Sequence, residues 1–308
     1  MTTSPVFTPG TRLRAGSSAR DRRRTTGARQ REAPGRKTFA LALGVGGARA
    51  LAHVAVIEAL DELGVRPVAI AGSSFGAMIG AAYAAGMTGK SIRHHVIALA
   101  HDRGGIFSRL VAARVAPLAR WITAPFGNPV LIDAAKFCEA FLPAEVPEDF
   151  AALVVPLKVV ATDLKGRCET ILDAGALKPA LAASMAIPGL IQPVETDGRI
   201  LVDGGAVNPL PFDCLRGLAD VLVAVDCSRG PDETDGIPDP WEAMSVTLHI
   251  MSQAIVAEKL KAGGPDLVIR PPIGIFQMLD FFQASAILRA AEPVKAEVKQ
   301  RLAALIGA

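Results

Sequence analysis

A serine between two glycines could act as a nucleophile in this chain. Gly72, Ser74 and Gly76 have the spacing G-x-S-x-G, in which a sharp turn between a strand and a helix exposes the serine hydroxyl. At a helix N-terminus, backbone N–H groups and the helix dipole favour developing negative charge. We therefore expect Ser74 to attack an ester carbonyl. Ser73, one residue out of register, is the competing candidate, and an ordinary Gly-Ser turn is the non-catalytic alternative.

A second glycine-rich turn lies upstream and could bind the oxyanion produced by such an attack. Residues 44–49, GVGGAR, follow a short apolar run, and consecutive glycines leave backbone amides unobstructed by β-carbons. The turn also approaches the dinucleotide fingerprint G-x-G-x-x-G, but Arg49 replaces its third glycine and Ser74 has no role in that scheme. The loop begins at Gly44. The expected oxyanion hole combines three residues of this loop, Gly46, Gly47 and Arg49, with Phe75, the residue after the nucleophile.

The nucleophile needs a base, and histidine fits that role poorly here. The usual chain order is serine, acid, histidine, and only His249 follows Asp203. Because His249 lies in an apolar helical stretch, the Ser74-Asp203-His249 triad remains only an alternative. Asp203 ends a short apolar run and precedes Gly204 and Gly205, which also fits a plain Asp-Gly turn. We expect a Ser74-Asp203 dyad in which burial raises the carboxyl pKa above about 3.9 and the two groups lie within about 3 Å.

Alternating strands and helices must position these groups. Short apolar runs predict strands at 38–43, 68–71, 157–162, 169–172, 200–202, 221–225 and 267–269. Helical periodicity predicts helices from residue 49 to a stop at Gly64, and at 74–85, 178–186, 241–261 and 281–306. This alternation predicts an α/β fold with a layered, mainly parallel sheet.

Two segments raise the question of membrane contact. The uncharged stretch 67–89 is long enough to span a bilayer, but it is rich in Ala, Gly and Ser, so a buried strand, turn and helix is expected. Residues 91–150 are expected to form broken helices over the core. Their arginines and aromatic residues would suit a membrane surface, and a solvated helical cap is the alternative; they include Arg109, Arg114, Arg120, Phe107, Trp121 and Phe126.

Charge is distributed unevenly along the 308 residues. Residues 1–37 carry ten basic side chains and two acidic ones, whereas the whole chain has a net charge of +3. This arm has too few large apolar residues to fold and is expected to be disordered. A solvated tail is the simplest interpretation, and a transit peptide or a segment that touches anionic lipid or nucleic acid is the alternative. We expect one catalytic domain over residues 38–308.

The four cysteines predict neither a metal site nor a disulfide framework. They are scattered, without a CxxC pair or a nearby histidine cluster, at Cys138, Cys168, Cys214 and Cys227. Reduced thiols and a cytoplasmic location are therefore expected, with contact at the membrane surface as a further possibility.

Four sequence blocks resemble the patatin-like phospholipase family, especially its bacterial members. In family order they are residues 44–49 followed by Ala52-His53, residues 72–76, residues 183–189 with Pro193, and residues 203–205 running on to Asn208-Pro209. The resemblance covers roughly residues 38–300. It implies a three-layer α/β/α fold and hydrolysis of the acyl esters of lipids, without a metal or cofactor. We expect no nucleic-acid partner.

By residue, the resemblance implies that Ser74 is the nucleophile, Asp203 is the dyad base, and Gly46, Gly47 and Arg49 belong to the oxyanion loop. One departure is Ala50, where the family loop usually ends in glycine. Alanine there is strained if the position needs a positive φ and harmless if it is helical. A lipid-binding or regulatory protein with the same fold but little catalytic rate is the alternative to an enzyme.

Overall fold

The computed structural model describes residues 35–102, 132–228 and 240–308, together with residues 104, 105, 108, 113 and 237. Residues Gly35–Ala308 form one compact unit. Most of the predicted basic arm, and the arginines and aromatic residues between positions 107 and 126, lie outside the described residues.

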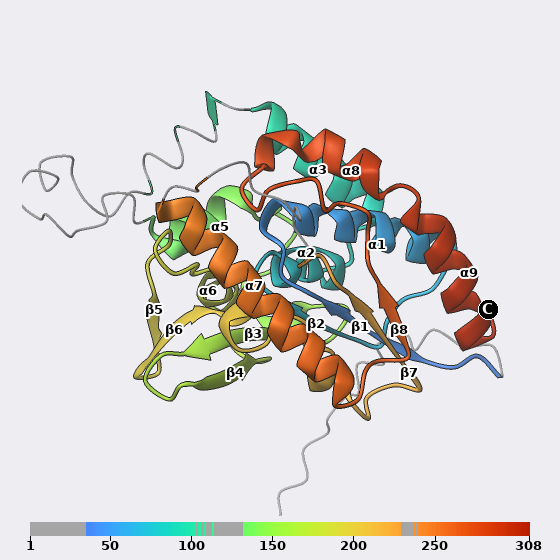
Figure 1. Cartoon of the computed structure of the whole chain (residues 1–308). Coiled ribbons are helices and arrows are strands. Elements are labelled where there is room, and N and C mark those ends of the chain that lie inside the picture. Colours follow the sequence, from blue (N-terminus) through green and yellow to red (C-terminus); the bar gives the residue numbers. More distant parts are fainter. Residues whose placement is uncertain are drawn as a thin grey trace, which may run out of the picture. The chain divides into compact units, whose positions relative to one another are not determined.

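The described residues contain an eight-stranded sheet (Figure 1). Its strands are β1 (Phe39–Leu43), β2 (Ala69–Ser73), β3 (Leu157–Asp163), β4 (Cys168–Leu172), β5 (Val194–Thr196), β6 (Arg199–Asp203), β7 (Val221–Val225) and β8 (Leu267–Ile269). The order is β5-β6-β3-β2-β1-β7-β8, and β4 also pairs with β3. The five strands from β3 to β8 along this order are parallel, whereas β4 and β6 pair antiparallel with β3, and β5 pairs antiparallel with β6. The predicted mainly parallel sheet is confirmed; β5 was not predicted.

Helices follow most of the strands, as the periodicity predicted. The α-helices are α1 (His53–Glu62), α2 (Phe75–Ala84), α3 (Gly89–His101), α5 (Ala134–Phe141), α6 (Leu177–Ser184), α7 (Pro240–Lys261), α8 (Ala284–Ala291) and α9 (Val294–Ile306). Short 3-10 turns are η1 (Gly47–Ala52), η3 (Phe150–Ala152), η4 (Gly204–Ala206), η5 (Phe212–Leu215) and η6 (Phe281–Gln283).

Two helix predictions need correction. The expectation of one helix over 281–306 is wrong, because η6 and α8 are separated from α9 at Glu292 and Pro293. Proline lacks the backbone N–H that an uninterrupted helix needs and its ring crowds the preceding turn. The helix predicted from Arg49 instead begins as the 3-10 turn η1, and α-helical geometry starts only at His53.

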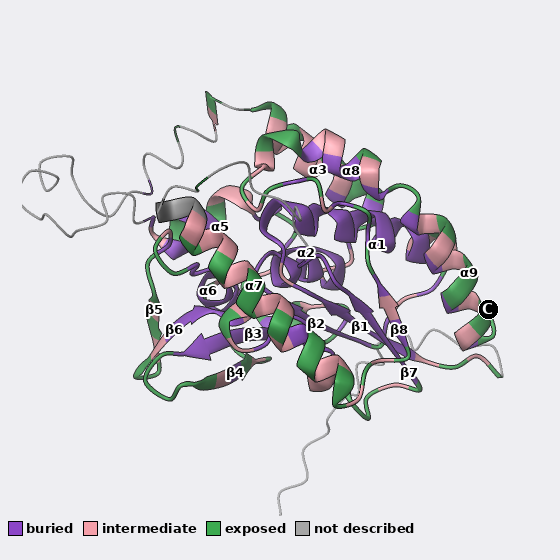
Figure 2. Ribbon diagram, viewed as in Figure 1, coloured by how far each residue is buried: buried purple, intermediate pink, exposed green. Residues whose placement is uncertain are grey.

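Residues that alternate along β1 face two different layers. Phe39, Leu41 and Leu43 enter the main core with α1, α2 and α9, whereas the small Ala40 and Ala42 face η5 and α7. Helices therefore cover both faces of the sheet, which makes three layers. Figure 2 shows the central strands and α2 buried, while α7 and α9 expose one side to solvent.

The uncharged stretch 67–89 folds as predicted, into the buried strand β2 and the helix α2. Over the part of the chain that the structure describes, no helix combines the length and the apolar character needed to cross a membrane.

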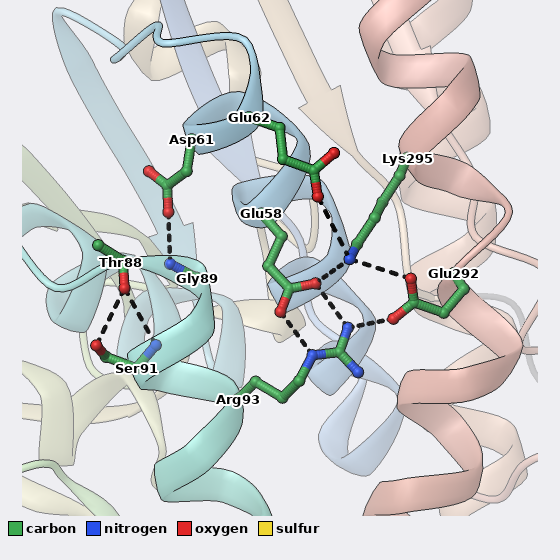
Figure 3. Close-up of polar contacts among 9 residues, drawn as sticks. All are labelled: Glu58, Asp61, Glu62, Thr88, Gly89, Ser91, Arg93, Glu292 and Lys295. Atoms are coloured by element: carbon green, nitrogen blue, oxygen red, sulfur yellow. Dashed lines mark hydrogen bonds and ion pairs between the residues drawn. The ribbon is translucent and has the colours of Figure 1, made fainter.

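A partly buried ion network joins α1, α3 and the α8–α9 segment (Figure 3). The Glu58 carboxylate binds Arg93 through two contacts of 2.6 and 2.7 Å and also binds Lys295. Glu292 binds the same two cations. Burial alone would raise the pKa of Glu58, but its hydrogen bonds to Arg93 and Lys295 outweigh burial and lower it. The network fixes α3 against the core.

Candidate active site

The ends of two strands bring the predicted nucleophile and base together. Ser73 of β2 pairs with Val160 of β3, and Asp203 of β6 pairs with the next β3 residue, Ala161. Because β4 occupies the other edge of β3, β2 and β6 share a single edge. The strands run in opposite directions, so their C-terminal ends meet. Ser74, the first residue after β2, therefore lies beside Asp203.

Ser74 occupies a strained turn between β2 and α2. Its φ of 56° and ψ of −133° are unusual for a residue with a side chain. The turn packs closely on the end of the neighbouring strand β1, since a β-carbon at Gly76 would lie 2.3 Å from Leu43 O. Ser184 holds the backbone: its Oγ accepts from Ser74 N at 2.9 Å and donates to Val160 O at 2.6 Å. These contacts fix the direction of the Ser74 hydroxyl.

The Ser74 hydroxyl donates to the Asp203 carboxylate, with Oγ 2.6 Å from Oδ2. The other carboxylate oxygen, Oδ1, accepts from Gly205 N at 2.7 Å, and Thr162 Oγ1 donates to Asp203 O at 2.8 Å. Burial raises the pKa of Asp203 to about 6, although the hydrogen bonds from Ser74 and Gly205 act in the opposite direction. The direction of this shift agrees with the expectation from sequence, and it makes the carboxylate a stronger base.

Ser73, the out-of-register candidate, points away from this pair. Its side chain is fully buried and its Oγ has no hydrogen-bond partner among the described residues. A β-carbon at Gly204 would lie 2.6 Å from that Oγ, so the hydroxyl lies beneath the Asp203 turn. A substrate cannot reach it there.

The glycine loop lies on the other side of Ser74. Gly47 has a φ of +56°, and a β-carbon at this position would lie 2.3 Å from Met278 O. The amides of Val45 and Ala48 donate to Pro209 O and Met278 O. Within the described residues, no acceptor is recorded for the amides of Gly46 and Gly47. These two amides are thus available to an oxyanion, and both glycines line the pocket that contains Ser74.

Arg49 lies behind this loop. The residue is only 2% exposed. Its guanidinium donates to Cys227 O at 3.3 Å, to Phe276 O at 3.1 Å and to Ser228 O at 3.3 Å. The Arg49 backbone amide donates to Gly46 O at 3.1 Å. The three side-chain contacts tie the loop to the segments that follow β7 and β8, and the backbone contact closes the loop on itself. The next residue, Ala50, lies inside η1 and is not among the described non-glycine residues with a positive φ. Alanine is therefore harmless there.

His249 of α7 lines the same pocket but is paired with other groups. Its Nδ1 lies 3.0 Å from Arg49 Nη2, and its Nε2 lies 2.9 Å from Gln253 Nε2. Burial and the neighbouring Arg49 charge lower the pKa of His249 to about 4. The structure therefore brings Ser74 and Asp203 together and places His249 with Arg49.

Two adjoining cavities open at the dyad. A pocket of about 110 Å³ contains Ser74 and Asp203, and an apolar cavity of about 270 Å³ lies next to it. Gly47 and Ile187 line both. Side chains of α2, α3 and α5 wall the larger cavity, among them Phe75, Met78, Ile92, Leu99, Phe137 and Phe141. Such a cavity suits a hydrocarbon chain. No group of three or more metal-ligating side chains is found among the described residues.

Sequence reasoning assigned no role to one residue that positions the nucleophile. Ser184 belongs to the small-residue block 183–189, which was noted only as part of the resemblance. Its hydroxyl bridges Ser74 N and Val160 O across segments far apart in the chain. A serine between an alanine and a methionine at a helix end carries no distinctive pattern, so only the resemblance could have marked it.

Comparison with known proteins identifies the family of this chain. A family model described as patatin-like phospholipase matches residues 41–215. An uncharacterized NTE family protein of Mycobacterium tuberculosis is 38% identical over 187 residues, which are 60% of this chain and 48% of that protein. Lysophospholipase NTE1 of Coccidioides immitis is 28% identical over 292 residues, which cover 86% of this chain and 18% of that protein. This chain thus spans about half or less of the length of these relatives.

The crystal structure of VipD from Legionella pneumophila aligns with 87% of this chain and 67% of its own, at 16% identity and a TM-score of 0.47. The family model covers more than half of the 308 residues and includes the glycine loop, Ser74 and Asp203. The chain belongs to the patatin-like phospholipase family.

Proposed function

We propose that this protein is a serine acyl hydrolase of lipid esters that uses a Ser74-Asp203 dyad. The observation that carries the proposal is the 2.6 Å hydrogen bond from Ser74 Oγ to a buried carboxylate beside an apolar cavity. The hydrogen bond supplies a nucleophile with its base, and the cavity supplies a place for an acyl chain. His249 is engaged by Arg49 and Gln253, so the dyad is preferred to the triad.

In the proposed reaction, Asp203 accepts the Ser74 proton while Oγ forms a bond to the ester carbonyl carbon. The amides of Gly46, Gly47 and Phe75 stabilise the oxyanion, and Arg49 contributes by holding the loop that presents them. The proton then passes from Asp203 to the departing alcohol. Water attacks the acyl-enzyme with Asp203 again as base, which releases the fatty acid and restores Ser74.

The lipid class is proposed from the cavities and from a relative. Among the described residues, an apolar cavity adjoins the dyad pocket and can hold one acyl chain, while the smaller pocket can hold a polar leaving group. The relative from Coccidioides immitis is named a lysophospholipase. We therefore place lysophospholipids first among the candidate substrates, ahead of diacyl phospholipids.

A fluorophosphonate probe and a lipid-class screen test the proposal together. Wild-type protein should be labelled at Ser74 and should release fatty acid from at least one lipid ester, and Ser74→Ala should do neither. Ser74→Ala removes a single hydroxyl group, so it is the matched blank. Labelling without turnover on any lipid would indicate a binding or regulatory protein. Full turnover by Ser74→Ala would refute the nucleophile.

Peripheral contact with a membrane is a second part of the proposal, because the substrate resides in lipid. Exposed apolar side chains lie on α7 and in the segment before η6, including Ile250 at 60% and Ile275 at 80% exposure. Their neighbours Met251 and Leu279 line the two cavities. Replacing Ile250 and Ile275 by Glu should reduce sedimentation with phosphatidylcholine vesicles and leave turnover of a water-soluble ester unchanged. Unchanged sedimentation would refute this docking face.

A further inference from the structure

The first peptide of the glycine loop, between Gly44 and Val45, is held on both sides. Its N–H, on Val45, donates to Pro209 O at 2.9 Å. Its carbonyl, Gly44 O, lies 2.8 Å from His53 Nε2. The amides proposed to bind the oxyanion follow within three residues, so the orientation of this peptide sets where they point.

His53 is suited to donate a hydrogen bond to this carbonyl. It is the first residue of α1 and is fully buried. Its second ring nitrogen, Nδ1, lies 3.6 Å from Cys227 Sγ. Burial lowers the pKa of His53 to about 4 and raises the pKa of the Cys227 thiol, so at neutral pH a neutral ring faces an S–H group. A carbonyl oxygen can only accept, so the 2.8 Å contact with Gly44 O requires the single ring proton on Nε2, and the unprotonated Nδ1 can then accept from the Cys227 thiol.

The Gly44 carbonyl also contacts the turn that carries Ser74. A β-carbon at Gly76 would lie 2.5 Å from Gly44 O, so the glycine loop and the nucleophile turn touch at this atom. A buried carbonyl without a donor is costly, and the peptide would rotate to find a partner. Rotation would move the following amides away from the Ser74 hydroxyl.

We propose that His53 is a positioning residue for the oxyanion loop: its Nε2–H fixes the Gly44–Val45 peptide, the acceptor-only Gly44 carbonyl requires this tautomer, and the Cys227 thiol is compatible with it as a donor to Nδ1. The catalytic part of this inference rests on the proposed ester hydrolysis. His53 itself does not touch the substrate, because it lies beneath the loop and outside the lining of both cavities.

Two matched substitutions separate the proposed role from general packing. In His53→Gln the terminal amide nitrogen reaches roughly the position of Nε2 and can still donate to Gly44 O. In His53→Asn the polar atoms end near the position of Nδ1, so the donor to Gly44 O is lost. We expect His53→Asn to lower kcat on a water-soluble ester by about 10- to 100-fold with little change in KM. His53→Gln should restore most of kcat.

Thermal unfolding of His53→Asn and His53→Gln measures how far each substitution disturbs packing. A packing defect alone should lower the stability and the kcat of both variants to a similar extent, whereas loss of the donor should lower kcat only in His53→Asn. Equal kcat values for His53→Asn, His53→Gln and wild type would overturn the inference, while wild-type turnover and Ser74 labelling would leave the proposed function standing.

The tautomer is tested without any activity. Nitrogen-15 NMR of the histidine rings should show His53 with a protonated Nε2 and an unprotonated Nδ1 from about pH 5.5 to about pH 8. A protonated Nδ1 would overturn the inference even if the enzyme is active. If His53→Asn does not fold, this spectrum of the wild-type protein decides the matter. Absence of ester turnover in the wild type would refute the proposed function and, with it, the catalytic part of this inference.

Discussion

Replacing Asp203 by Asn should abolish activity and make the protein more stable. The carboxylate is buried, and its pKa rises from an ordinary 3.8 to about 6. That displacement corresponds to about 3 kcal/mol of unfavourable free energy for holding the ionised group in the folded protein at pH 8. Asparagine has nearly the same shape and no charge, so Asp203→Asn should gain up to about 3 kcal/mol at that pH while losing the base.

The stability gain of Asp203→Asn over wild type should depend on pH. Because the folded-state pKa of Asp203 is raised, the favourable contribution of this group is complete below about pH 3.8 and is lost as the pH rises through about 6. The stability difference between Asp203→Asn and wild type should therefore shrink from about 3 kcal/mol at pH 8 to roughly half of that at pH 5. Urea unfolding followed by circular dichroism at the two pH values measures it.

Asp213 provides a matched control with the opposite sign. Burial raises the pKa of Asp213, but its hydrogen bonds with Lys259 and Asn208 outweigh burial and lower it. Asp213→Asn should therefore destabilise the protein at pH 8. If Asp203→Asn is no more stable than wild type at pH 8, or if its advantage grows toward pH 5, the assignment of Asp203 as a buried base with a raised pKa is refuted.

Further outcomes follow from the same geometry. Below pH 6, kcat/KM should fall about tenfold per pH unit as Asp203 is protonated, and a flat stopped-flow profile to pH 5 would exclude it as base. Gly47→Ala should lower kcat at least about 100-fold, because its β-carbon would meet Met278 O at 2.3 Å; wild-type kcat would contradict the oxyanion role. Glu58→Ala should lower the free energy of unfolding in urea by about 2–4 kcal/mol, because the partly buried Arg93 and Lys295 would lose the carboxylate that they share. Ala100→Phe should narrow the apolar cavity and slow turnover of long-chain esters more than of acetate esters, with equal losses as the contrary result.

Much of the fold could be predicted because its signals are local. An apolar run of five residues such as β1 or β7 has few alternatives to a buried strand, and the small residues of α2 mark a helix that packs closely. The two glycine turns were also visible, since close backbone approach excludes side chains. The proline at position 293 could have predicted the break between α8 and α9, but the helical periodicity on both sides of it favoured one continuous helix.

The same distinction between local sequence signals and contacts of distant segments applies to the candidate site. The types and order of Ser74, Asp203 and the glycine loop can be read from the chain, because a nucleophile turn and an oxyanion turn each occupy a few consecutive residues. That β2 and β6 meet end to end on one edge of β3 is a matter of register, which depends on pairing between segments 87 residues apart for β2 and β3 and about 40 residues apart for β3 and β6.

The sequence by itself therefore determined the chemical groups and the layered α/β fold. Only the tertiary structure decided which of these groups meet: Ser74 with Asp203, Arg49 with three carbonyl groups behind the loop, and His53 with Gly44 O. The physical reason is that hydrogen bonds between distant segments, and the burial that shifts the Asp203 pKa, exist only once the sheet and its helices have assembled.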